Sequence, residues 1–354
     1  IEEFAPRALQ EDYDNAGLQV GDPDDACSGV LLSLDVSEAT VEEAAERGCN
    51  LIITHHPLLF KGVKSISPAT QTGRILLAAI RKGIAIYAAH TNLDNARGGV
   101  SWRMAEKLGL TDVSVLQPQC GKLAKVVVFV PGDYVESVKA AMFAAGAGNI
   151  GDYDSCAYRM SGTGSFRPRP TAHPFVGEAG KVHFEPEERL EVIVPAWKAD
   201  GVVRAMAKAH PYEEPAYDII PLANADAYSG SGVVGNISPT PVSEFAALLK
   251  RIFGVAAVRF GGDMSREVRR VAMCGGSGAA FITDAIRSGA DIYVTGDLKY
   301  HDYTTYLSQI RLADIGHYES EQCTKEIFYG LIQKKMPNFA TYSAMTDKNP
   351  VNYI

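Results

Sequence analysis

The chain has 354 residues, of which 46% are hydrophobic and 21% charged, and it carries a formal net charge of −8. Because a typical domain has about 100 to 200 residues, this length predicts two or three domains. The longest apolar runs fall far short of the roughly 20 residues of a membrane span, and the acidic balance offers no basic surface for nucleic acid. Membrane insertion and nonspecific binding to nucleic acid are therefore not expected.

Six cysteines lie far apart, form no CxxC pair and fall mostly in hydrophobic segments, which indicates reduced thiols in the core. The first ten residues, IEEFAPRALQ, have the pattern of a short amphipathic helix. They lack the charged segment and the long apolar run of a signal peptide. The sequence therefore predicts a cytoplasmic protein.

The first third of the chain alternates short apolar strands with amphipathic helices. Such runs are typical of strands covered by helices on both faces, in a layered α/β sheet with a substantial parallel component. The expected elements are the strands GVLLSLD from Gly29, LIIT from Leu51 and IAIYAAH from Ile84, and the helices VEEAAERG from Val41 and RILLAAIRKG from Arg74.

Residues 121–223 predict a separate insert. Their order is strand, helix, two strands, helix, strand, which matches the ferredoxin-like split βαβ unit. The two helices are DYVESVKAAMFAAG from Asp133 and ADGVVRAMAKAHP from Ala199. The Gly- and Pro-rich stretch 167–188 predicts an exposed excursion.

The last third repeats the alternation of the first. Its expected strands are VRRVAMCGG from Val268, DIYVTGD from Asp291 and RLADIGH from Arg311. The helix, Gly and strand of residues 41–57 resemble those of residues 281–297, which indicates a weak internal repeat. We therefore expect residues 1–120 and 224–354 to form one α/β domain with a single sheet, into which residues 121–223 are inserted.

Two imidazoles follow the strand LIIT, since the segment THHP places His55 and His56 at its carboxyl end. Parallel sheets commonly present ligand groups at this end of their strands. Neighbouring side chains in extended backbone point opposite ways, so two consecutive histidines suit two metal ions if the strand end lies beside both. The alternative is that both are polar loop residues.

The segment AAHTNLDNA places His90 and Asp94 after the next strand. The carboxylate of Asp94 suits a bridge between two cations. His90 is either a third imidazole ligand or a residue that orients a ligand, and we favour the orienting role. A hydrogen-bonded histidine at a strand end is the structural alternative.

The segment GHYESE places His317 and Glu321 four residues apart where a strand passes into a helix. On a helix this spacing puts both side chains on one face, which is a known pairing of metal ligands. Glu319 points elsewhere on the same turn. Its alternative role is an acid that complements the helix dipole.

Together these strand ends supply a mixed set of imidazoles and carboxylates, which suits Zn, Mn or Fe better than ions that prefer oxygen alone. The lack of a cysteine ligand favours an open, catalytic or exchangeable pair of ions over a closed structural zinc. Two ions about 3.5 to 4 Å apart could share a hydroxide that acts as the nucleophile of a hydrolysis.

Three other segments carry weaker signals. GGSG from Gly275 could hold a phosphate, but it lacks the lysine of a P-loop, and a plain turn is preferred. TGDLKYHD offers Asp297, Lys299 and His301 to the same cleft, or forms a solvated loop. HPYEEPAYD from His210 could cap the cleft or bind a ligand, but its prolines favour a helix stop.

In this order the segments resemble the NIF-three-like family, whose members are also called GTP cyclohydrolase I type 2 homologs. The resemblance covers essentially the whole chain. It rests on DYDNAGLQVGDP from Asp12, LLSLDVS from Leu31, THHPLLFKG from Thr54, YAAHTNLDNARGG from Tyr87, TGDLKYHD from Thr295, GHYESE from Gly316 and the terminal NPVNYI.

The resemblance implies a site for two divalent metal ions, with Asp94 and Glu321 as bridging ligands. The five implied ligands are His55, His56, Asp94, His317 and Glu321. The resemblance also implies that the insert is similar to PII-like and CutA-like proteins and that the chain forms a toroidal homohexamer whose metal sites face an internal cavity. Tyr300 stands where many relatives have a histidine, so no role carries over to it.

Two functions remain open, because fold and metal ligands do not by themselves define a reaction. The first is a metal-dependent hydrolase that acts on a nucleotide-like substrate through a metal-bridging hydroxide, with His90 or Glu319 nearby for proton transfer. Its specific form is the hydrolytic opening of the imidazole ring of GTP. The second is a non-enzymatic metal-binding or regulatory protein whose insert senses a ligand.

Overall fold

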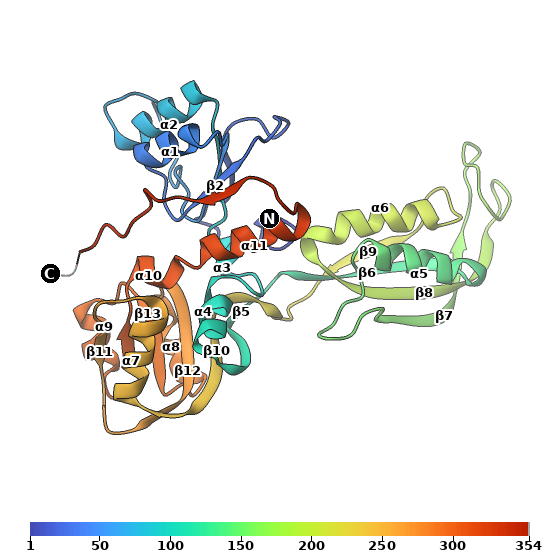
Figure 1. Ribbon diagram of the computed structural model, residues 1–354. Helices are drawn as coiled ribbons and strands as arrows, with labels where there is room; N and C mark the ends of the chain where they lie inside the picture. Colours follow the sequence, from blue (N-terminus) through green and yellow to red (C-terminus); the bar gives the residue numbers. More distant parts are fainter. Residues whose placement is uncertain (353–354) are drawn as a thin grey trace. The chain divides into compact units, whose positions relative to one another are not determined.

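The computed structural model describes residues 1–352 of a mixed α/β protein, as the alternation of strands and helices predicts (Figure 1). Tyr353 and Ile354, the last two residues of the NPVNYI motif, lie outside the described residues. The chain divides into two compact units. Residues 1–118 and 228–354 form what we call the main unit, and residues 119–227 form the inserted unit.

The first sheet of the main unit has five strands in the order β1-β4-β3-β2-β15. All neighbours are parallel except β1, which runs antiparallel to β4. Helices α1 and α2 pack on each other and on this sheet, and α11 packs on β2 and β15. The bounds are β1 Gly17–Val20, β2 Val30–Ser33, β3 Leu51–Thr54, β4 Ala85–Ala88, β15 Thr341–Ser343, α1 Glu38–Glu46, α2 Gln71–Lys82 and α11 Thr324–Lys335.

The second sheet of the main unit has six strands in the order β11-β14-β13-β12-β10-β5. Strands β12, β13 and β14 are parallel, and β11 and β10 run antiparallel to their neighbours. The strands are β5 Thr111–Gln119, β10 Asp226–Pro241, β11 Arg259–Gly261, β12 Glu267–Ser277, β13 Ile292–Gly296 and β14 Arg311–Asp314. The helices are α3 Thr91–Asp94, α4 Val100–Leu108, α7 Val242–Phe253, α8 Ile282–Arg287, α9 Tyr300–Tyr306 and α10 His317–Glu321.

The expectation of a single sheet is wrong. Each third of the chain builds its own set of three parallel strands, and an antiparallel strand ends that set, β1 in the first sheet and β11 in the second. The sheets still exchange chain segments, since β15 from the last third pairs with β2. The predicted repeat therefore exists as two sheets of similar local construction.

The repeat is visible in the turns that precede β3 and β13. Gly48 follows α1 and Gly289 follows α8, each with a left-handed φ, +70° and +74°. Glycine adopts this conformation at no steric cost. In each sheet the strand that follows this glycine carries a threonine at or next to its end, Thr54 as the last residue of β3 and Thr295 as the last but one of β13. Comparable strand ends thus carry His55 in one sheet and Asp297 in the other.

The inserted unit has the element order predicted from the sequence. Its antiparallel sheet has the order β7-β8-β6-β9, and apolar side chains of β6, β8, α5 and α6 form its core. The bounds are β6 Leu123–Pro131, α5 Val135–Ala144, β7 Ala157–Phe166, β8 His183–Pro195, α6 Ala199–Ala209 and β9 Tyr217–Pro221. The predicted exposed excursion includes residues 183–188, but they lie in β8, where they pair with β7.

Two smaller expectations need correction. The predicted helix at IEEFAPRALQ is only a 3-10 turn at Arg7–Leu9, because Pro6 disfavours helical backbone in the residue before it. All six cysteines are free, but only Cys49, Cys274 and Cys323 are buried. Across residues 1–352, none of the helices has both the length and the apolar character that a membrane span requires.

Candidate metal centre

Side chains from three strand ends of the main unit meet in one cluster. His55 and His56 follow β3, and the parallel pairing of Thr54 with Ala88 in β4 brings the segment with His90 and Asp94 beside them. Helix α10 begins three residues after β14 and carries the remaining two residues, His317 and Glu321. The structure thus brings together all five side chains that the resemblance implies as ligands.

A first group consists of His55, Asp94 and Glu321. His55 Nε2 lies 3.6 Å from Asp94 Oδ1 and 3.6 Å from Glu321 Oε1, which is too long for a hydrogen bond. His55 Nε2 and Asp94 Oδ1 are both buried, and neither has a hydrogen-bond partner among the described residues. Leaving such atoms unsatisfied costs about 1 to 3 kcal/mol each. The group therefore fits a cation that both atoms contact.

A second group consists of His56, His317 and Glu321. Glu321 Oε2 lies 3.0 Å from Nε2 of each histidine, and the two Nε2 atoms lie 3.2 Å apart. Glu321 thus faces the first group with Oε1 and the second with Oε2. Its carboxylate is the link between two adjacent sites, whereas Asp94 belongs to the first group alone.

The outer nitrogen of each imidazole is held by an oxygen. His55 Nδ1 lies 2.8 Å from the carbonyl oxygen of Ala89. Because a carbonyl only accepts, Nδ1 of His55 carries a proton, so that in the neutral ring Nε2 presents its lone pair to the cluster. Carboxylates hold Nδ1 of the other two rings. His56 Nδ1 lies 2.9 Å from Asp35 Oδ1, and His317 Nδ1 lies 2.7 Å from Asp297 Oδ2. Such partners typically fix the orientation of metal-binding histidines.

His90 forms a third group close enough to hold a metal ion with His55 and His56, and its ring lies 5.2 Å from the ring of His55 and 5.5 Å from that of His56. Its Nδ1 lies 2.8 Å from Asp14 Oδ1, while Asp14 Oδ2 accepts from the backbone nitrogen of Thr91 at 2.9 Å. Burial raises the pKa of Asp14, but the hydrogen bonds from His90 and Thr91 outweigh it and lower the pKa to about 2. His90 is therefore oriented by a buried carboxylate.

The charges of the cluster depend on one another. Burial lowers the pKa of His56, but its hydrogen bonds to Asp35 and Glu321 raise it to about 10. The hydrogen bond to Glu321 raises the pKa of His317 to about 9, against the effect of burial. Burial raises the pKa of Glu321, and the surrounding histidines bring it well below its usual range. Without metal, imidazolium groups neutralise this carboxylate.

Gly276, within the GGSG segment, makes room for Glu321. A Cβ atom at Gly276 would lie 2.1 Å from Glu321 Oε1, and the residue has a left-handed φ of +61°. The amides of Gly276 and Gly278 already donate to Ser320 Oγ and Thr295 Oγ1. GGSG thus accommodates a ligand of the cluster, and the two amides that a phosphate would use are already occupied.

A cavity of about 340 Å³ adjoins the second group and is lined by His56, His317, Asp35, Asp297 and Glu319, among others. Glu319 is buried and accepts a hydrogen bond from Asn349 Nδ2 at 2.8 Å. Arg259 is the one basic residue besides histidine among the described residues that line this cavity, and its guanidinium pairs with Asp314.

The other candidates from the sequence lie away from the cluster or play a structural part. Asp297 reaches His317 from a left-handed φ of +57°, but Tyr300 is 74% exposed and its ring meets that of His301 edge-on. In the inserted unit, His210 Nε2 lies 2.9 Å from the carbonyl oxygen of Phe129, which agrees with the helix-stop interpretation of HPYEEPAYD.

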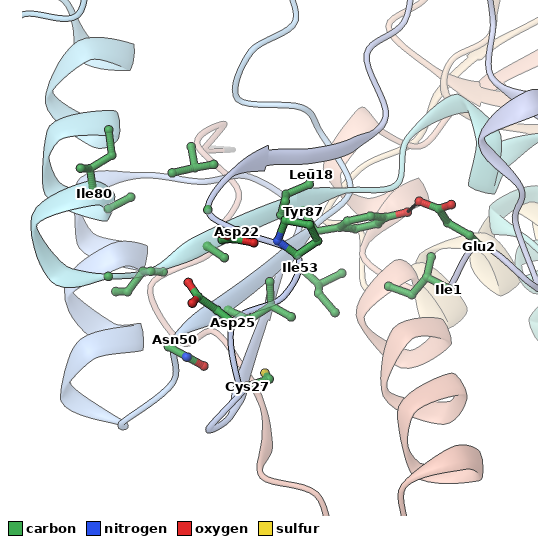
Figure 2. Close-up of a pocket in the computed structure, with 18 of the residues that line it drawn as sticks. Ile1, Glu2, Leu18, Asp22, Asp25, Cys27, Asn50, Ile53, Ile80 and Tyr87 are labelled. Carbon is green, nitrogen blue, oxygen red and sulfur yellow. Dashed lines mark hydrogen bonds between the residues drawn. The ribbon is translucent and has the colours of Figure 1, made fainter.

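A larger cavity of about 960 Å³ lies at the first sheet and is lined by Leu18, Ile53 and Ile80, among others (Figure 2). On one side the hydroxyl of Tyr87 donates to Glu2 at 3.0 Å. None of the five cluster residues lines this cavity. The cavity beside His56 and His317 is therefore the better candidate for a substrate.

Known proteins match this chain over its whole length. A Bacillus subtilis protein named GTP cyclohydrolase 1 type 2 homolog is 40% identical over 361 residues, which cover all of this chain and 96% of the relative. The crystal structure of a Bacillus cereus protein related to NIF3 has a TM-score of 0.87 at 38% identity and covers all of this chain and 96% of that one. A Staphylococcus aureus structure has a TM-score of 0.78 at 30% identity, with the same coverage.

The model of the family Duf34/NIF3 (NGG1p interacting factor 3) matches residues 1–350, which include the whole cluster. The chain therefore belongs to the Duf34/NIF3 family.

Proposed function

We propose that this protein is a metal-dependent hydrolase that acts on a nucleotide-like substrate and holds two divalent ions. His55, Asp94 and Glu321 hold one ion, and His56, His317 and Glu321 hold the other. The observation that carries the proposal is a pair of buried atoms, His55 Nε2 and Asp94 Oδ1. They lie 3.6 Å apart, and neither has a hydrogen-bond partner among the described residues. The mixed N/O ligand set suits Zn, Mn or Fe. Bound ions of this kind supply Lewis acidity and lower the pKa of water.

The side chains around the ions have separate tasks. Asp35 and Asp297 fix the rings of His56 and His317, so that Nε2 of each ring points to Glu321. Asp14 holds the Nδ1 proton of His90, which leaves the other ring nitrogen of His90 to accept or deliver a proton. Glu319, in the adjoining cavity, is the second candidate for proton transfer.

The adjoining cavity has the size of a small-molecule site, and the charged residues of its lining are mostly acidic. Its volume of about 340 Å³ falls within the usual range for small ligands, about 300 to 1,000 Å³. Arg259 is the group of this lining that suits phosphate, because a guanidinium offers several donors in one plane, and it already pairs with Asp314. The names of the relatives, GTP cyclohydrolase 1 type 2 homolog, make GTP the first substrate to test.

The test is a product-resolved assay of GTP with protein loaded with Zn, Mn or Fe. We expect turnover that Glu321→Gln and His55→Ala abolish. Glu326→Gln is the matched control, because Glu326 is an exposed residue of α11 that pairs with Lys107. Metal-loaded protein that is inactive on GTP and on a panel of nucleotides and phosphoesters would contradict the hydrolase proposal. It would favour a non-enzymatic metal-binding or regulatory protein.

We also propose that the chain assembles as a homohexamer and that the inserted unit is of the PII-like or CutA-like kind. Both proposals rest on the family resemblance. Light scattering of the purified protein tests the assembly, and a mass of one chain or of two chains at micromolar concentration would contradict it.

A further inference from the structure

A cavity of about 400 Å³ lies wholly within the inserted unit. It is formed by the end of β7, the segment that follows it, part of β8 and the residues after α6. All of its lining residues belong to this unit, so its chemistry does not depend on where the main unit lies. The proposed metal centre shares no residue with it.

Aromatic rings form one part of the wall. The ring of Tyr212 lies 6.0 Å from that of Phe166 and 6.2 Å from that of Phe175, at interplanar angles of 58° and 43°. Phe129 lines the same cavity from β6. These rings line the cavity, and the faces of aromatic rings carry partial negative charge.

Carboxylates form the other part of the wall. Glu187, Glu213 and Glu214 line the cavity, and its described lining residues include no Lys, Arg or His. Glu187 lies against the backbone of β7, since a Cβ atom at Gly164 would be 2.1 Å from Glu187 Oε2. The absence of a side chain at Gly164 thus lets this carboxylate take its place in the wall.

Tyr212 connects the two kinds of wall. Its hydroxyl oxygen is buried and has no hydrogen-bond partner among the described residues. Burial, with the charge of Glu187 added to it, raises the pKa of Tyr212, so the hydroxyl keeps its proton. The ring of Tyr212 and the carboxylate of Glu187 thus lie next to each other in the wall.

These walls select for positive charge. Three carboxylates repel anions such as nucleotides. Among the described residues, these carboxylates belong to none of the groups that lie close enough together to hold a metal ion. A desolvated cation over aromatic faces is stabilised by the ring quadrupole. The unit already contains one such contact, since the guanidinium of Arg189 lies 5.7 Å from the centre of the Phe129 ring.

We propose that this cavity binds a small organic cation with an alkylated ammonium group. Its volume is within the range of sites for small molecules. Phe166, Phe175 and Tyr212 contact the alkyl groups, and the Glu187 carboxylate neutralises the charge. The proposal stands independently of the hydrolase activity.

The experiment uses the full chain and isothermal titration with choline, tetramethylammonium and spermidine as probes. We expect saturable binding of at least one of them. For choline, the neutral isostere 3,3-dimethylbutan-1-ol is expected to bind more weakly by about tenfold or more, because it has the shape without the charge. Glu187→Gln and Phe166→Ala are each expected to weaken binding of the best probe by about tenfold.

Two variants serve as controls. Glu178→Gln removes an exposed carboxylate that pairs with Lys181 outside the cavity lining, and Tyr158→Ala removes an exposed ring of β7. Both are expected to bind like the unaltered chain, and circular dichroism checks that every variant is folded. The proposal is overturned if no probe binds saturably at millimolar concentration, if the neutral isostere equals choline, or if Glu187→Gln and Glu178→Gln bind alike.

Discussion

His56 Nε2 lies 3.2 Å from His317 Nε2, although the two residues are 261 positions apart in the chain. Both nitrogens also lie 3.0 Å from Glu321 Oε2. Two imidazolium groups so close together repel each other, and the shared carboxylate of Glu321, together with Asp35 and Asp297 behind the rings, offsets this repulsion. A divalent cation held by the same side chains would replace these protons.

Binding of metal should release protons. In the metal-free protein the pKa values of His56 and His317 are raised to about 10 and about 9, so both rings are protonated at neutral pH. A metal ion needs the neutral rings, and the apparent affinity should therefore rise with pH until the pH exceeds these values, by about tenfold per pH unit for each proton displaced. Zinc titrations in buffers of different ionisation enthalpy measure the released protons. Proton release of zero at pH 7 would contradict the prediction.

The carboxylates behind the histidines should tune metal affinity. Asp297→Asn keeps the size of the side chain but weakens the acceptor for His317 Nδ1. We expect a loss of about 10- to 100-fold in zinc affinity, which is typical of such partners. Asp302→Asn is the control, because Asp302 is a half-buried carboxylate that accepts from the backbone nitrogen of Lys299 at the start of α9 and is not part of the cluster. Equal affinities of the two variants would show that Asp297 has no such part.

Gly276→Ala should damage the metal centre while the fold persists. The new Cβ atom would meet Glu321 Oε1 at 2.1 Å, and the left-handed backbone adds a cost of about 1 to 2 kcal/mol. Gly289→Ala separates these effects, since Gly289 has a similar φ of +74° but no atom within 4 Å of its Cβ position. We expect similar losses of thermal stability from the backbone, with loss of metal binding only in Gly276→Ala, as measured by zinc titration and thermal denaturation.

Glu43 of α1 should stabilise the fold through its hydrogen bonds to the C-terminal segment at Met345 and Thr346. Its carboxylate accepts from the backbone nitrogens of Met345 and Thr346, both at 2.9 Å, and from the hydroxyl of Thr346 at 2.7 Å. Burial raises the pKa of Glu43, but these bonds outweigh it, so the net shift is below the ordinary 4.5. Its stabilising effect is thus present above pH 4.5 and is lost as the pH falls through the lowered value.

We expect Glu43→Gln to reduce the free energy of unfolding by about 1 to 3 kcal/mol at pH 7, because a charged acceptor is lost. The reduction should be smaller at pH 3, where Glu43 itself becomes protonated on unfolding. Urea denaturation at the two pH values measures both effects. The same reduction at pH 3 and pH 7 would rule out a contribution from the charge.

The sequence was sufficient to predict the strand ends and their polar residues. An apolar run such as LIIT followed by THHP marks a strand end without reference to the rest of the chain. The spacing of His317 and Glu321 likewise predicts the short helix α10, which the structure contains. That these ends meet in one cluster came from the family resemblance, because no local pattern encodes the contact.

The parts that were missed depend on contacts between distant segments. Asp14 lies 76 residues from His90, and nothing in DYDN distinguishes it from Asp12. Gly276 looked like a residue of a plain turn, since its role depends on the position of Glu321. The single sheet was wrongly expected for the same reason, because strand periodicity does not reveal which strands pair.

The metal content of the purified protein tests the central proposal most directly. Elemental analysis without chelator or added metal should find two divalent ions per chain, about one in Asp94→Asn and fewer than one in Glu321→Gln, because Glu321 belongs to both groups and Asp94 to one. Glu326→Gln should retain both ions, and circular dichroism should find all variants folded. Folded protein without stoichiometric metal even after incubation with zinc, or Glu321→Gln with the same metal content as the unaltered chain, would contradict the account.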